Sequence, residues 1–86
     1  MPWIIDKDHI DNGKAVGTMG PRGYTGDGTE LHCQFRMYDD DGILYYEGRN
    51  NTSDDDNAFG PLDDFGAPNA GCTSIRYLVK GRWETL

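Results

Sequence analysis

The strongest constraint on the fold is an alternation of residue types between Leu31 and Tyr38. Leu31, Cys33, Phe35 and Met37 are separated from one another by single, more polar residues. A period of two over such a run is typical of a β-strand with one face in the core and the other toward solvent. We therefore expect these four side chains to face the core, and His32, Gln34 and Arg36 to face outward.

A turn follows this strand directly. Asp39-Asp40-Asp41-Gly42 is a turn-like sequence, and Ile43–Tyr46 then continues as a second apolar arm. Shorter strand-like runs lie at residues 3–5, 15–19, 73–79 and 82–86. Asn12-Gly13 and Lys80-Gly81 are the turns expected to close two further hairpins.

Two segments lack a strand period. Residues 17–28 contain five glycines and Pro21, which indicates a loop. In residues 50–71, Phe59, Leu62 and Phe65 fall three apart, so this segment is either an acidic loop or contains a single helical turn around residues 61–65. The predicted fold is mostly β: a small antiparallel sheet of four to six strands, with long acidic loops and at most one short helix. The alternative is a small α+β sheet with a real helix near residues 61–66.

Length and composition limit the size of the core. The chain has 86 residues, which is room for a single domain over residues 1–86. Only 36% of the residues are apolar, but the aromatic residues make up 12%, and each can bury on the order of 150–250 Å². We expect a thin aromatic core under polar loops.

Negative charge is concentrated in one third of the chain. The net charge is −7, and residues 39–71 carry nine acidic side chains but only one basic side chain, Arg49. Such an uneven distribution makes a directional field, which favours basic partners and repels nucleic acid.

Compartment signals are few. The N-terminal residues lack an apolar run of signal-peptide length, and no stretch approaches the ~18–20 apolar residues that span a bilayer. We therefore expect a cytoplasmic protein with no membrane contact. Cys33 and Cys72 are the only cysteines, and in a reducing compartment they are expected to be unpaired.

Catalytic and metal-binding patterns are missing from the sequence. A calcium loop counted from Asp8 places Met19 at its twelfth position, and one counted from Asp55 places Gly66 there, where glutamate is needed. His9, His32, Cys33 and Cys72 lack the spacing of a zinc site. The serines lie outside nucleophile motifs, and the glycine-rich loop lacks the phosphate-loop ending. We expect neither an enzyme nor a cofactor; a nonstandard metal-binding protein is the less favoured alternative.

Direct nucleic-acid binding is also disfavoured. The basic residues are scattered, and binding phosphates against a net charge of −7 requires a segregated basic face. At most a minor basic face is formed by Arg76, Lys80 and Arg82. These side chains are expected to pair with the acidic segment instead.

The function class that remains is recognition of another protein. Carboxylates on a rigid sheet can compete for the Arg/Lys groove of a nucleic-acid-handling protein, and aromatic side chains among them can act as anchors. The expected partner is a basic protein or nucleoprotein complex. The candidate contact residues are Asp39, Asp40, Asp41, Tyr45, Asp54, Asp55, Asp56, Asp63 and Asp64.

In size, acidity and lack of a catalytic motif the chain resembles the small inhibitors encoded by phages and mobile elements, such as anti-CRISPR proteins and DNA mimics. The resemblance rests on overall composition and on the two aspartate triplets, 39–41 and 54–56. It implies an inhibitor of a nucleic-acid-handling complex, and it assigns no role to a particular residue. The alternative is an acidic accessory or structural protein with a different partner.

Overall fold

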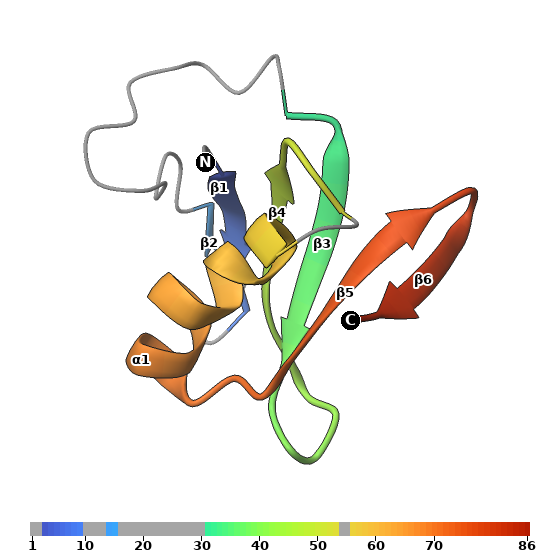
Figure 1. Ribbon diagram of the computed structural model, residues 1–86. Coiled ribbons are helices and arrows are strands. Elements are labelled where there is room, and N and C mark those ends of the chain that lie inside the picture. The colour runs from blue at the N-terminus through green and yellow to red at the C-terminus, as the bar shows by residue number, and fades with distance from the viewer. Residues whose placement is uncertain (1–2, 10–13, 16–30, 54–55) are drawn as a thin grey trace.

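A single antiparallel sheet forms the body of the protein (Figure 1). The computed structural model describes residues 3–9, 14–15, 31–53 and 56–86. The six strands lie in the order β2-β1-β4-β3-β5-β6, which confirms the predicted fold class. Their bounds are β1 Trp3–Asp8, β2 Lys14–Ala15, β3 Cys33–Tyr38, β4 Leu44–Asn50, β5 Ser74–Val79 and β6 Arg82–Thr85.

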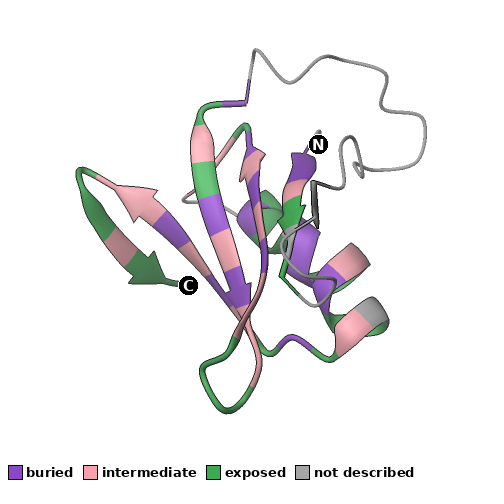
Figure 2. Cartoon of the chain, turned by 180° about the vertical axis from the view of Figure 1, so that it is seen from behind, coloured by how far each residue is buried: buried purple, intermediate pink, exposed green. Residues whose placement is uncertain are grey.

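The central hairpin of β3 and β4 follows the predicted pattern. Phe35 and Met37 are buried in β3, and Leu31 is buried just before the strand begins. Cys33 is half-buried and packs against the core. Gln34 and His32 are exposed, while Arg36 is half-buried on the face opposite the core. Bands of alternating burial along the strands are visible in Figure 2.

The first strand is longer than predicted. It continues past residue 5 to Asp8, because it pairs with β4 along its length, with a β-bulge between Ile5 and Lys7. The second strand is shorter, since β2 contains only Lys14–Ala15. The predicted Asn12-Gly13 turn, the end of the run at 15–19 and most of the loop at 17–28 lie outside the described residues.

A helical segment over residues 56–70 packs on one face of the sheet (Figure 1). It begins as a 3₁₀ helix, η1 (Asp56–Phe59), widens into a π-helix, η2 (Leu62–Gly66), and ends as α1 (Ala67–Ala70). The segment is thus longer than the single turn predicted around residues 61–65. Gly71 ends it in a left-handed conformation at φ 73°, which glycine adopts without steric cost.

Tertiary contacts hold this helical segment against the sheet. The Phe65 ring meets Trp3 of β1 and Tyr46 of β4 edge-on, with centroid distances of 6.0 and 4.8 Å. Ala58 and Leu62 are buried in the same core cluster. Edge-on aromatic pairs contribute about 0.5–1.5 kcal/mol each beyond the area they bury.

A polar contact inside the core joins β4, β5 and η1. Asn50 is fully buried, and its Nδ2 donates to the Tyr77 hydroxyl at 3.0 Å. The same hydroxyl donates to the carbonyl oxygen of Ala58 at 2.7 Å. Because unsatisfied polar groups are costly in an apolar interior, these bonds favour one position of η1 over the sheet.

Both cysteines are free thiols, and they differ in environment. Burial raises the pKa of the Cys72 thiol to about 11, and the negative charge of Asp39 adds to the shift. At pH 8 the thiolate fraction of Cys72 should be about one hundredth of that of a thiol with the ordinary pKa of 9.0, and alkylation requires the thiolate. We therefore expect iodoacetamide to modify Cys72 slowly in the folded protein.

Mass spectrometry over a time course tests this expectation. In denaturant without reductant, both cysteines should be modified at similar rates. A native disulfide, or rapid native alkylation of Cys72, would contradict the environment seen here.

Candidate functional site

The turn between β3 and β4 contains the first predicted contact residues. The Asp39 carboxylate accepts hydrogen bonds from the backbone N–H groups of Asp41 and Ile43, each at 2.9 Å. It also accepts one from the Tyr45 hydroxyl. The Ile43 amide, more than any other contact, holds the pKa of Asp39 below its ordinary value, while the bond to Asp39 raises the pKa of Tyr45. Asp39 and Tyr45 therefore stabilise the turn.

The other side chains of this turn are directed to solvent. Asp40 and Asp41 are exposed, and neither forms an ion pair within the described part of the chain. Ile43 is 55% exposed beside them, which is the highest exposure of the large hydrophobic residues described. The tip of the hairpin thus presents an apolar group next to two carboxylates.

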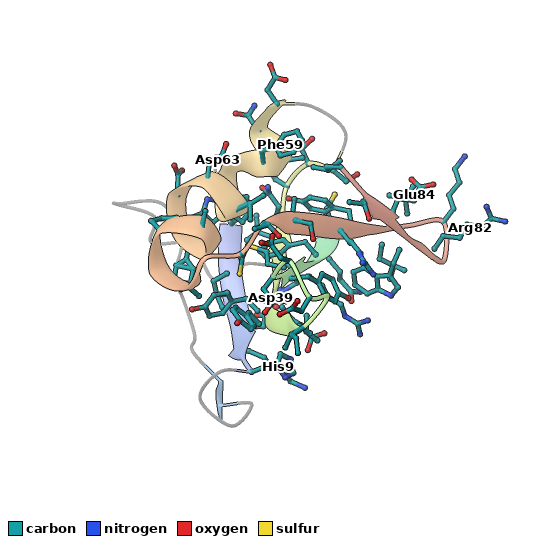
Figure 3. All side chains as sticks on the ribbon, turned by 90° about the horizontal axis from the view of Figure 1, so that it is seen from below. His9, Asp39, Phe59, Asp63, Arg82 and Glu84 are labelled. Carbon is teal, nitrogen blue, oxygen red and sulfur yellow. The ribbon has the colours of Figure 1, made fainter. Side chains whose placement is uncertain are left out.

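The helical segment presents a similar combination. Asp56, Asp63 and Asp64 are exposed there, again without an ion pair to any residue that the structure describes. Phe59 is 38% exposed and lies four residues before Asp63 (Figure 3). Asp54 and Asp55, which were also predicted as contact residues, lie outside the described residues.

The C-terminal end of the helical segment lies next to the end of β3. After α1, the N–H of Cys72 donates to the Gly66 carbonyl at 3.2 Å, and the N–H of Thr73 donates to the Tyr38 carbonyl at 2.8 Å. The end of the helix is therefore joined to the end of β3, immediately before the turn. We call the five exposed carboxylates on these two elements the acidic outer surface: Asp40, Asp41, Asp56, Asp63 and Asp64.

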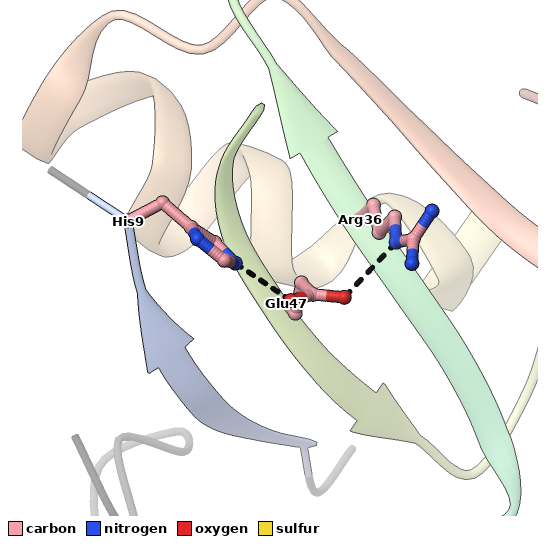
Figure 4. Close-up of polar contacts among 3 residues, drawn as sticks. All are labelled: His9, Arg36 and Glu47. Atoms are coloured by element: carbon pink, nitrogen blue, oxygen red, sulfur yellow. Dashed lines mark hydrogen bonds and ion pairs between the residues drawn. The ribbon is translucent and has the colours of Figure 1, made fainter. Parts of the chain in front are cut away.

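Two other acidic side chains are paired on the opposite face of the sheet. Asp6 accepts from Arg49 through both carboxylate oxygens, at 3.0 and 3.1 Å. Glu47 lies between His9 Nε2, at 2.6 Å, and Arg36 Nε, at 3.0 Å (Figure 4). Burial alone would raise the pKa of Glu47, but the hydrogen bonds to His9 and Arg36 outweigh burial and lower it.

The basic side chains of the last hairpin do not neutralise the acidic outer surface. Arg76 lies over the Tyr38 ring, with its Cζ 4.2 Å from the ring centroid. Arg82 lies at the far end of the β5–β6 hairpin (Figure 3). None of Arg76, Lys80 and Arg82 forms an ion pair with a described acidic residue. The sequence analysis expected these three basic side chains to pair with the acidic segment. Within the described residues of that segment they do not.

A small hollow lies on the face of the sheet that carries the paired acids. Its volume is about 180 Å³, and Trp83 of β6 forms part of its wall. Pockets for drug-sized ligands occupy ~300–1,000 Å³, so this hollow suits one side chain or one planar group. Its other polar lining residues are Asp6, Lys7, Gln34, Glu47 and Arg49.

No family model matches the chain, and no curated protein or solved structure matches it. Within the described residues, no cluster of three or more His, Cys, Asp or Glu side chains could hold a metal ion. No described helix is long and apolar enough to cross a membrane.

The sequence pattern does not reveal two functional candidates. It places Ile43 in the second arm of the hairpin, whereas β4 begins only at Leu44. Its position directly after a turn was the available signal. Trp83 was assigned only to the last hairpin, and its contact with Arg36, at 4.2 Å from Cζ to the ring centroid, spans residues far apart in the sequence.

Proposed function

We propose that this protein is a non-enzymatic binding module whose acidic outer surface engages a basic, nucleic-acid-handling protein, in the manner of a small inhibitor. The observation that carries the proposal is the separation of charge. Asp6 and Glu47 are paired with arginines on the sheet, whereas the carboxylates of the acidic outer surface have no ion pair among the described residues. Their charge is available to a partner.

The exposed apolar residues support the same reading. Ile43 lies beside Asp40 and Asp41, and Phe59 lies in the helical segment that carries Asp56 and Asp63. Protein interfaces commonly place an apolar or aromatic anchor within a polar rim, where the anchor supplies most of the affinity. Charge then steers the encounter, and burial of the apolar groups holds the complex.

General chemistry supports the inhibitor class. A protein that handles nucleic acid presents arginine and lysine side chains to phosphates, and carboxylates on a folded scaffold can occupy the same groups. The acidic outer surface is spread over a turn and a helix. It would therefore contact a basic groove through two projecting elements.

Charge neutralisation provides the test. Asp40→Asn/Asp41→Asn and Asp63→Asn/Asp64→Asn each remove two negative charges while leaving Asp39 in its turn. We expect each pair to slow association with the partner by about threefold to tenfold at low salt, because rim charges act mainly on the association rate. Exposed substitutions of this kind should change the free energy of unfolding by less than ~0.5 kcal/mol.

The partner is first captured on the immobilised parent protein and identified, and its association rates are then measured at low and high salt. Glu84→Lys is the matched control, since it also changes the net charge by two units, but on the exposed end of β6. It should associate almost like the parent. If Glu84→Lys slows association as much as the paired variants, the effect is one of total charge, and the proposed surface is wrong.

A further inference from the structure

The face of the sheet opposite the helical segment has a different character from the rest of the protein. Residues paired across antiparallel strands share a face. Arg36 is opposite Glu47 on one side and Arg76 on the other, and Arg76 is in turn opposite Thr85. We call this side the open face. Its charged residues are Asp6, Lys7, Arg36, Glu47, Arg49 and Arg76.

Positive charge exceeds negative charge on the open face. Among the described residues, this face carries four cations, Lys7, Arg36, Arg49 and Arg76, and two carboxylates, Asp6 and Glu47, although the whole chain has a net charge of −7. The exposed carboxylates of the acidic outer surface lie on the helical segment and on the hairpin turn. The basic residues therefore lie on a different part of the sheet from these carboxylates.

Arg76 supplies the uncompensated part of that charge. It lies beside Arg36 on the neighbouring strand, an unfavourable arrangement for two like charges. Arg36 is compensated by Glu47, whereas Arg76 has no acidic partner among the described residues. Its Nε is buried and has no hydrogen-bond acceptor within the part of the chain that the structure describes. An anion bound near these two arginines would relieve the repulsion between them.

Planar groups lie next to these cations. The Arg36 guanidinium is 4.2 Å from the Trp83 ring centroid, and the Arg76 guanidinium is 4.2 Å from that of Tyr38. The hollow of about 180 Å³ adjoins Trp83, and Gln34 on its wall is exposed. The hollow thus combines an aromatic wall with hydrogen-bonding donors and acceptors.

We propose that the open face binds a short stretch of single-stranded nucleic acid. One base enters the hollow against Trp83, within reach of the Gln34 amide, and an adjoining phosphate lies near Arg36 and Arg76. Sheets that bind single strands combine these groups: aromatic and arginine planes on which bases stack, and cations that follow the backbone.

The lining of the hollow favours a nucleotide over an acidic side chain. The formal charges on its wall, from Lys7, Arg49, Asp6 and Glu47, sum to zero, with Glu47 shared between the hollow and Arg36, so the hollow suits a planar polar group. Arg76 lies outside the hollow and has no ion pair among the described residues. A ligand with a neutral planar part and an adjoining anion matches both features, and a carboxylate side chain matches only the second.

The inference goes beyond the proposed function, because it concerns the other side of the sheet. The two proposals fit together if the partner carries a nucleic-acid strand, but either can fail alone. The oligonucleotide test uses the isolated protein and different variants from the association test, so their outcomes are distinguishable.

The probe is a fluorescein-labelled oligothymidylate of eight nucleotides, and binding is followed by fluorescence anisotropy at low salt. We expect a dissociation constant on the order of 10⁻⁴ M, because few phosphates are contacted. Arg76→Ala should weaken binding and lower the slope of log affinity against log salt by about 0.7, the value for one phosphate contact on a single strand. Arg82→Ala, which removes the same charge at the tip of the β5–β6 hairpin, should bind like the parent.

A second arm tests the stacked base without altering the protein. An abasic strand of the same length keeps the phosphates and should bind about tenfold more weakly to the parent protein. Trp83→Ala should reproduce that loss with the intact strand. Three results would overturn the proposal: no binding at low salt, equal effects of Arg76→Ala and Arg82→Ala, or an octaglutamate peptide that competes as well as the oligonucleotide.

Discussion

Replacing Gly48 with alanine is expected to destabilise the protein by about 3 kcal/mol, because the added methyl group has no space. A Cβ at this position would lie 2.0 Å from the carbonyl oxygen of Ile4 and 2.7 Å from Cζ of Phe35. The first contact is with backbone, and Ile4 belongs to a strand that is paired with β4 around Gly48. The clash can be relieved only by separating β1 from β4.

Urea unfolding measures this effect, and Gly60→Ala is the matched control. A Cβ at residue 60 would be 3.6 Å from Nε1 of Trp3, an ordinary contact, and residue 60 is helical. Since alanine favours helix over glycine by up to about 1 kcal/mol, the control should be neutral or more stable. A Gly48→Ala variant that unfolds at the parental urea concentration would show that β1 and β4 are less closely paired than described.

Phe35→Ala is expected to cost about 3–5 kcal/mol, a large share of the ~5–15 kcal/mol that stabilises a domain. The Phe35 side chain is 1% exposed and meets Tyr77 edge-on, with a centroid distance of 5.6 Å. Tyr77 in turn holds Asn50 and the Ala58 carbonyl. A cavity at residue 35 would therefore loosen the contact between η1 and the sheet as well.

The neighbouring residue provides the comparison for this variant. Gln34 lies in the same strand and is exposed on the other face, so Gln34→Ala should change the unfolding free energy by less than ~0.5 kcal/mol. Thermal or urea unfolding of the two variants tests the register of β3, since a slip of one residue exchanges the faces. Equal stabilities would rule out the register seen here.

The strands could be predicted because their information is local. The alternation from Leu31 to Met37 repeats every two residues, and so does that of Ile75, Tyr77 and Val79. A strand of period two has only two faces, so the apolar set identifies the buried one. Gly42 and Gly81, at φ 77° and 80°, lie in the turns that the sequence indicated.

The helical segment could not be predicted to its full length, for a geometric reason. Its backbone changes from 3₁₀ through π to α within residues 56–70, and its buried residues Ala58, Leu62 and Gly66 lie four apart. Alanine and glycine are small, so this spacing gives only a weak apolar period in the sequence. The segment also contains Pro61 and Pro68, and a proline inside a helix lacks the N–H that the preceding turn requires. Contacts of Phe65 with Trp3 and Tyr46 stabilise the segment, and these residues are distant in sequence.

The candidate surfaces also depend partly on local sequence and partly on tertiary contacts. The amino-acid sequence by itself determined that acidic side chains would be concentrated in residues 39–71, since the order of charged residues along the chain does not depend on the fold. Only the tertiary structure decided which of them are available: Glu47 is paired with Arg36, and Asp39 is bound within its own turn. It also placed Arg36 beside Arg76 and over the ring of Trp83. Pairing across strands brings together residues that no local pattern relates, because strand order and register depend on the whole core.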